Sequence, residues 1–230
     1  TSMEIYVAYK DYDWMMGMVE DCLAQITKSV LGRTTAEYAG NILEFQGPYA
    51  RIPLFEAIQQ QTGIDVSGMD EEQLRNQCKV WNIPTSPDMG KGKLIDQIFG
   101  EKVEKTLIQP TFITDYPIEM TPLAKKHRSK EGLVERFELF ISGKEVANAY
   151  SELNDPIDQR ERFEDQLKLA NRGDADAMSL DEEFLKSMEF AMPPASGLGI
   201  GIDRLVMMLT NQTSIQEVLF FPQMRPESAK

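Results

Sequence analysis

Three glycines near the C-terminal end of the chain, Gly197, Gly199 and Gly201, recur at every second position, and aliphatic residues lie between them. Side chains alternate between the two faces of a β-strand, so this period places all three glycines on one face. Glycine inside a strand costs about 0.5–1 kcal/mol relative to alanine. The bare backbone therefore predicts that a flat group lies against this strand.

A helix is predicted to follow the glycine strand, because Asp203, Arg204 and the apolar run Leu205–Leu209 come directly after it. We expect Asp203 to cap this helix and Arg204 to lie in its first turn, beside the bare face. A base on the strand and a phosphate at the arginine would suit this arrangement. The GxGxG pattern is not the GxGxxG dinucleotide fingerprint, and no Gly-Lys-Ser/Thr phosphate-binding element is present.

Composition excludes several classes of protein. The 230 residues are enough for one domain with a smaller inserted module, and no apolar run is long enough to cross a membrane. The single histidine, His127, excludes a multi-histidine zinc site, and its neighbours Lys125–Lys130 predict an exposed basic loop. The net charge of -13 argues against non-specific nucleic-acid binding. Cys22 and Cys78 lie in separate helical patterns, which predicts free thiols and a cytoplasmic location.

Hydrophobic periodicity predicts an α+β fold with a mixed, mainly antiparallel sheet flanked by helices. Strands are predicted at residues 1–9, 110–117, 134–141, 145–152 and 196–202, with two more, joined at Gly47-Pro48, between Asn41 and Pro53. Helices are predicted at residues 13–31, 157–171 and 181–190. Residues 54–108 have helical spacing throughout, which predicts a small helical insertion within the domain.

Two predicted strands carry glutamate and tyrosine on one face. Glu4 and Tyr6 share a face of the first strand, and Asn148, Tyr150 and Glu152 share a face of the return strand of the hairpin. If these faces meet solvent, they need no functional explanation. If they meet each other, the carboxylates and rings form a pocket for a cation with an aliphatic stem.

Glu138 and Glu145 flank the turn of this hairpin on facing strands. Two carboxylates brought close together repel each other unless a hard divalent cation lies between them. The functional interpretation is therefore magnesium with a nucleotide, and the alternative is two exposed hairpin glutamates. Glu145 has the opposite parity to Asn148, so a shared site requires a twist or a bulge near the turn.

These residues carry a family resemblance. The glycine strand with Arg204 resembles motif 3 of the class II aminoacyl-tRNA synthetases, and residues 1–9 resemble the second strand of motif 2. Four segments are similar to the lysyl-tRNA synthetases of this class: Phe137–Phe140, Glu145–Asp155, Gly197–Arg204 and Phe221–Pro226. The matches span nearly the whole chain, in the order of the family.

The resemblance implies activation of lysine with ATP and transfer of lysine to tRNA(Lys), in a full-length enzyme that is a homodimer. It implies that Glu152 and Tyr6 bind the ε-ammonium group of lysine and that Tyr150 packs along its methylene stem. Glu4 and Asn148 would hold the α-amino and carboxylate end.

The resemblance also implies the nucleotide side of the site. Glu138 and Glu145 would hold Mg²⁺ around ATP, with Glu138 in the ATP site itself. Arg204 would contact the γ-phosphate, and Gly199 and Gly201 would lie along the adenosine.

We expect residues 1–230 to be part of a longer catalytic domain, because Thr1 falls inside a predicted strand. By the resemblance, motif 1, the arginine and loop of motif 2, and the anticodon-binding domain would precede it. The chain alone is therefore expected not to form the adenylate. Two alternatives remain open: a paralogue that attaches lysine-like groups to a translation factor, and a non-catalytic binding module on the same fold.

Overall fold

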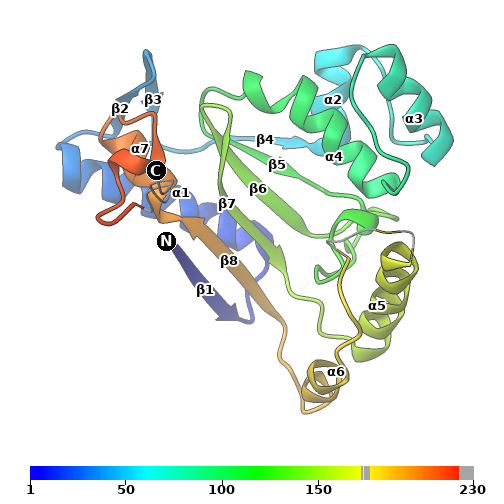
Figure 1. Cartoon of the computed structure of the whole chain (residues 1–230). Coiled ribbons are helices and arrows are strands. Elements are labelled where there is room, and N and C mark those ends of the chain that lie inside the picture. Colours follow the sequence, from blue (N-terminus) through cyan, green and yellow to red (C-terminus); the bar gives the residue numbers. More distant parts are fainter. Residues whose placement is uncertain (172, 174–176, 223–230) are drawn as a thin grey trace, which may run out of the picture.

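A six-stranded sheet organises the chain, of which the computed structural model describes residues 1–171, 173 and 177–222. The strands run in the order β1-β8-β7-β6-β5-β4 (Figure 1), and every pair is antiparallel except β4 with β5. Their bounds are β1 (Ser2–Ala8), β4 (Ala50–Pro53), β5 (Thr111–Thr114), β6 (Arg136–Ile141), β7 (Lys144–Ser151) and β8 (Ala195–Gly201). The predicted α+β fold with a mixed, mainly antiparallel sheet is confirmed.

Helices pack against both faces of this sheet. They are α1 (Tyr12–Leu31), α2 (Leu54–Thr62), α3 (Glu71–Val80), α4 (Lys91–Lys102), α5 (Pro156–Ala170), α6 (Glu182–Met188) and α7 (Ile202–Leu209). α1 and α7 share a hydrophobic core with the aliphatic side chains of β7 and β8, whereas α2, α3 and α4 form a second core with β5 and β6. Helices thus occur where periodicity predicted them, and the status of residues 54–108 as an insertion stays a prediction.

β8 presents its two faces as the sequence predicts. Leu198 and Ile200 are each 2% exposed and pack in the core beneath α1 and α7. The glycines therefore face the opposite side of the sheet. α7 follows without a loop, and its N-cap is Gly201 rather than Asp203, so the predicted cap is wrong. The strand ends at Gly201, which moves Asp203 into the first helical turn, where its charge suits the helix dipole.

The predicted pairing of two strands across Gly47-Pro48 is also wrong. β3 (Asn41–Glu44) pairs instead with β2 (Thr35–Tyr38) in a separate two-stranded sheet, and β4 joins the main sheet beside β5. A two-residue turn at Ala39 and Gly40 joins β2 to β3, with φ of 50° and 80°. Turns with two positive φ values match the twist of antiparallel strands, which favours this hairpin.

The loop around His127 is basic and exposed at Lys126 and at residues 128–130, as predicted, but the His127 side chain is not exposed with them. The His127 side chain is only 8% exposed, and its Nε2 lies 3.3 Å from the Tyr12 hydroxyl and 3.6 Å from Asp115 Oδ1. The neighbouring cations are paired as well: Arg128 binds Glu135, and Lys130 binds Asp115. The buried carboxylates of Asp115 and Glu135 bind these side chains and hold the loop against the sheet. Both carboxylates lie outside residues 125–130, so the sequence of the loop alone does not predict these contacts.

No helix in the described part of the chain is long and apolar enough to cross a membrane. Cys22 and Cys78 are both free, as predicted. The segment Phe221–Pro226, one of the four that carry the family resemblance, lies outside the described residues after Pro222.

Candidate functional site

The polar faces of β1 and β7 meet across the glycine strand. β8 lies between them, with Gly197 opposite both Tyr6 and Tyr150. Two residues along, Gly199 stands opposite Glu4 and Asn148 in the same way. Strand alternation then places these four polar side chains on the glycine side of the sheet. The structure therefore brings together two polar faces that are more than 130 residues apart in the sequence.

Glu152 completes this group at the end of β7. A Cβ atom placed on Gly197 would lie 2.1 Å from Glu152 Oε1 and 2.8 Å from Tyr6 Cε1, so both side chains lie directly over the glycine backbone. The Tyr6 hydroxyl donates a hydrogen bond of 3.0 Å to Glu4 Oε2. We name Glu4, Tyr6, Asn148, Tyr150 and Glu152 the glutamate–tyrosine pocket.

Glu152 differs from the rest of this pocket because its carboxylate is largely buried and has no positive charge beside it among the described residues. Its carboxylate makes no hydrogen bond or ion pair with any described residue, and burial raises its pKa to about 7. Burial, with the nearby charge of Glu152, also raises the pKa of Tyr150 to about 12. A half-buried carboxylate of this kind is stabilised when a cation binds beside it.

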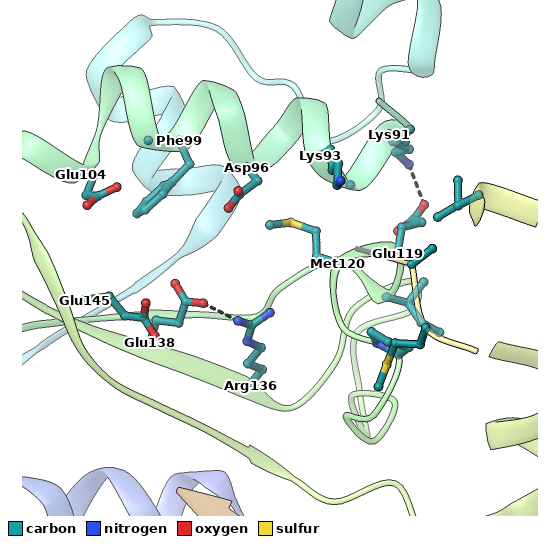
Figure 2. Close-up of a pocket in the computed structure, with 18 of the residues that line it drawn as sticks. Lys91, Lys93, Asp96, Phe99, Glu104, Glu119, Met120, Arg136, Glu138 and Glu145 are labelled. Atoms are coloured by element: carbon teal, nitrogen blue, oxygen red, sulfur yellow. Dashed lines mark hydrogen bonds and ion pairs between the residues drawn. The ribbon is translucent and has the colours of Figure 1, made fainter. Parts of the chain in front are cut away.

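A second group of side chains lines a large cavity further along the sheet. The cavity has a volume of about 1320 Å³ and lies between α4, the β6–β7 hairpin and the start of α7. Glu138 and Glu145 reach it from the hairpin, Asp96 reaches it from α4, and Glu104 reaches it from the short 3₁₀ helix (Glu104–Thr106) that follows α4 (Figure 2). The structure thus places the two predicted metal ligands in one cavity and adds two carboxylates that the sequence analysis did not identify.

A β-bulge brings Glu145 to this side of the sheet. The pairing shifts from Leu139 opposite Ala147 to Phe140 opposite Glu145, which leaves Val146 as an extra residue on β7. The extra residue reverses the parity of Glu145, so it shares a face with Glu138. This is the bulge that a shared site requires.

The charges around the cavity are strongly coupled. Burial first, and then the charge of Glu138, raises the pKa of Glu145, whereas Arg204 and Arg136 lower it. The pKa of Asp96 is raised by burial and by Glu138. A cation beside Glu145 would stabilise its charged form, although basic side chains are as numerous as acidic ones among the described residues that line the cavity.

The residues present fit a magnesium ion only in part. Carboxylate oxygens are ligands that Mg²⁺ prefers, and Mg²⁺ is commonly held by one or two carboxylates together with substrate phosphates. Glu138 and Glu145 can serve in this way, but the described residues contain no group of three side chains that would hold a metal by themselves. The pair therefore suits Mg²⁺ that arrives with a nucleotide.

Arg204 and the remaining glycines border a smaller hollow of about 300 Å³, together with Asn148 and Glu145. Arg204 contacts the Glu145 backbone carbonyl, and its Nη1 lies 3.6 Å from Glu145 Oε2. A Cβ atom on Gly199 would meet nothing nearer than Asn148 O at 4.0 Å. The glycine backbone, the arginine and the carboxylates are therefore contiguous, as a bound nucleotide would require.

Sequence reasoning missed Asp96, Glu104 and Arg136 in the larger cavity, and the buried Tyr116 that contacts Glu138. Asp96 lies on α4 and Glu104 begins the 3₁₀ helix that follows it, but nothing in the sequence shows that these two elements cover the hairpin. Arg136 has the same parity as Glu138 on β6, so the alternation could have identified it. Tyr116 donates to Glu138 Oε2 at 2.8 Å from outside any strand, and no sequence signal points to it.

Comparison with known proteins identifies relatives of the chain. The family described as tRNA synthetases class II (D, K and N) matches residues 1–225. A lysine–tRNA ligase of Porphyromonas gingivalis strain W83 is 61% identical over 227 residues, which are 99% of this chain and 39% of that protein. Lysine–tRNA ligases of Christiangramia forsetii and Azobacteroides pseudotrichonymphae are 59% and 56% identical, again over 99% of this chain, and the match covers 40% and 45% of their lengths. The chain therefore spans about two fifths of the length of the curated relatives it matches.

Proposed function

Because the chain belongs to the class II tRNA synthetases of the D, K and N group, we propose that it forms the lysine-binding and much of the ATP-binding part of a lysine–tRNA ligase. The observation that carries this proposal is Glu152, a half-buried carboxylate without a counter-charge among the described residues. The ε-ammonium group of lysine would supply the missing charge. An aspartate side chain there would place two negative charges together, and an asparagine side chain would leave the carboxylate uncompensated.

The glutamate–tyrosine pocket suits the rest of the lysine molecule. Tyr6 joins Glu152 at the ammonium group, and the Tyr150 ring offers an apolar wall for the methylene stem. Glu4 and Asn148 lie across Gly199 from each other, two residues toward the nucleotide side, where the α-amino and carboxylate groups would lie. This order directs the lysine carboxylate toward the larger cavity.

ATP would lie over the glycine strand and the neighbouring hairpin, in the two hollows that Glu145 and Arg204 both line. Gly199 and Gly201 would lie along the adenosine, Arg204 would bind the γ-phosphate, and Glu138 and Glu145 would hold Mg²⁺. When bound, Mg²⁺ would neutralise charge on the phosphates. The carboxylates of Glu138 and Glu145 would repel the phosphates of ATP, and Mg²⁺ between them would offset this repulsion.

The proposed reaction is attack of the lysine carboxylate on the α-phosphate, which forms lysyl-adenylate and releases pyrophosphate. The carboxylate is already ionised at neutral pH, so the site needs no general base. The main barrier is the approach of two anions, and positioning together with cationic groups lowers it. Transfer of the lysyl group to the 3′ end of tRNA(Lys) would follow.

The remaining properties of the whole protein are part of the same proposal. We place the enzyme in the cytoplasm, as a homodimer that acts on tRNA(Lys). The resemblance assigns the arginine of motif 2 to a segment that precedes residue 1, so residues 1–230 are proposed to bind lysine and not to form the adenylate unaided.

Isothermal titration of lysine into a protein of the length of its curated relatives tests the proposal. We expect lysine to bind, and norleucine, which lacks the ammonium group, to bind at least tenfold more weakly. Glu152→Gln should reduce lysine affinity by about a hundredfold or more, as breaking a buried ion pair does. Glu161→Gln is the matched control, because Glu161 is exposed on α5, far from the pocket in the sheet.

Equal binding of lysine and norleucine would show that the pocket does not recognise an ammonium group. Binding of neither lysine nor ATP would favour the non-catalytic module. Lysine-dependent exchange of pyrophosphate into ATP by residues 1–230 alone would contradict the proposal that these residues bind lysine but do not form the adenylate unaided.

A further inference from the structure

Arg136 lies between the two halves of the candidate site. Its side chain, only 12% exposed, projects from β6 on the same face as Glu138, and β6 pairs with the strand that carries Asn148. Figure 2 shows the guanidinium group beside Glu138 on the floor of the cavity. Neither the family resemblance nor the proposed function gives this arginine a role.

All three nitrogens of the guanidinium group are engaged. Nε donates to Asn148 Oδ1 at 3.1 Å, Nη1 donates to Thr121 Oγ1 at 2.6 Å, and Nη2 forms an ion pair with Glu138 Oε1. One rigid plane therefore contacts a residue of the glutamate–tyrosine pocket at one edge and a proposed magnesium ligand at another. A lysine side chain at position 136 could not make these three contacts, because its ammonium group lacks the planar, fixed arrangement of donors of a guanidinium group.

Tyr116 fixes the plane from below. The guanidinium carbon lies 4.5 Å from the centre of the Tyr116 ring, and the Tyr116 hydroxyl donates to the second oxygen of Glu138 at 2.8 Å. Both oxygens of Glu138 are thus held by groups that are themselves in contact. A shift of Asn148 must move Arg136, and a shift of Arg136 must move Glu138.

We propose that Arg136 is a positioning residue that couples lysine binding at Asn148 to nucleotide and Mg²⁺ binding at Glu138. The inference rests on the proposed function, because it takes Asn148 and Glu138 as parts of the two substrate subsites. When lysine orders the Asn148 amide, the guanidinium group holds the Glu138 carboxylate in the orientation that Mg²⁺ with ATP requires. The converse holds as well, since coupling between two binding sites is reciprocal.

The test is a thermodynamic cycle measured on a protein of the length of its relatives. Lysine affinity is determined by titration calorimetry with and without Mg²⁺ and a non-hydrolysable ATP analogue, and the ratio of the two dissociation constants is the coupling factor. Couplings between sites are typically about 5- to 150-fold. We expect a coupling factor in this range for the unchanged protein, and a factor within about twofold of one for Arg136→Lys.

Two further variants separate coupling from folding. Thr121→Val removes the 2.6 Å hydrogen bond to Nη1 but keeps the arginine, so it should lower the coupling factor partially. Thr111→Val is the matched control: Thr111 is another buried threonine, and its hydroxyl donates to the Gln109 carbonyl away from Arg136. It should leave the coupling factor unchanged. If Arg136→Lys fails to fold, Thr121→Val decides the question.

The outcomes distinguish the inference from the function on which it rests. Weaker binding of both ligands to Arg136→Lys with an unchanged coupling factor would show a merely structural role and overturn the inference. A coupling factor of one in the unchanged protein would overturn it as well, while leaving the lysine–tRNA ligase proposal intact. Failure of the unchanged protein to bind lysine or the analogue would overturn both.

Discussion

Gly197 is the position where a single methyl group should change ligand recognition without unfolding the protein. In Gly197→Ala the new Cβ would lie 2.1 Å from Glu152 Oε1 and 2.8 Å from Tyr6 Cε1. Ordinary contacts between heavy atoms are about 3.5 Å, so the carboxylate must retreat by about 1 Å or more. Glu152 ends in a flexible side chain and Tyr6 is 67% exposed, so both can move. The free energy of unfolding should therefore fall by less than about 1 kcal/mol.

The main effect of Gly197→Ala should be a lower affinity for lysine. A displacement of about 1 Å in a positioning group can cost about a hundredfold, and a hundredfold loss of affinity corresponds to about 2.7 kcal/mol. Calorimetric titration of lysine without nucleotide measures this loss, and titration of an ATP analogue shows whether it is specific. We expect lysine affinity to fall about a hundredfold while analogue affinity changes by less than about threefold.

Gly201→Ala on the same strand provides the reciprocal control. Its Cβ would meet nothing nearer than Arg204 Cδ and Val146 O, both at 3.6 Å, so the glutamate–tyrosine pocket is undisturbed. We expect unchanged lysine affinity and weaker binding of the analogue. Retention of full lysine affinity by a folded Gly197→Ala protein would refute the reasoning, because it would mean that Glu152 and Tyr6 do not hold the lysine side chain above Gly197.

Two more predictions follow from buried charges. Burial raises the folded-state pKa of Glu152 to about 7, so protonation of Glu152 stabilises the ligand-free protein in full below the unfolded-state pKa of 4.5, and this stabilisation is lost as pH rises through 7. Lysine binds the ionised carboxylate, so its affinity should rise about tenfold per pH unit up to pH 7 and then level off. Calorimetric titrations at several pH values measure this rise, which Glu152→Gln should abolish. Arg162 is 6% exposed, binds Asp158 and donates to the carbonyls of Thr121 and Ala124, so Arg162→Met should lower the free energy of unfolding by about 3 kcal/mol in urea titrations, whereas a loss below about 1 kcal/mol would show that these contacts are not needed.

The alternation of side chains was the most reliable guide to the site. Period-two patterns correctly placed Glu4 with Tyr6 and Asn148 with Tyr150, because the face of a strand depends only on parity. Alternation does not determine which strands become neighbours. That β8 lies between β1 and β7 follows from long-range packing. The residues alone left open whether the two polar faces meet, and only the family resemblance favoured one site.

The features that the sequence analysis missed depend on contacts between distant segments. The bulge at Val146 leaves no mark in the local pattern, yet it decides whether Glu145 can share a site with Glu138. His127 was placed on the surface because its neighbours are basic, but the buried Asp115 lies beside it in the structure. The packing of α4 over the hairpin likewise depends on the second hydrophobic core and not on the acidic residue that it brings into the cavity.

The three glycines of β8 have different physical reasons for lacking a side chain. At Gly197 the protein itself fills the space, because Glu152 and Tyr6 lie where a Cβ would be. At Gly199 and Gly201 a Cβ would meet protein atoms only at 4.0 and 3.6 Å, distances that packing tolerates. Glycine at the first position therefore leaves room for Glu152 and Tyr6, whereas contacts within the chain give no such reason at the other two. Since glycine in a strand is costly, its presence at the other two positions favours a ligand that lies against the backbone there, on the Arg204 side of the sheet.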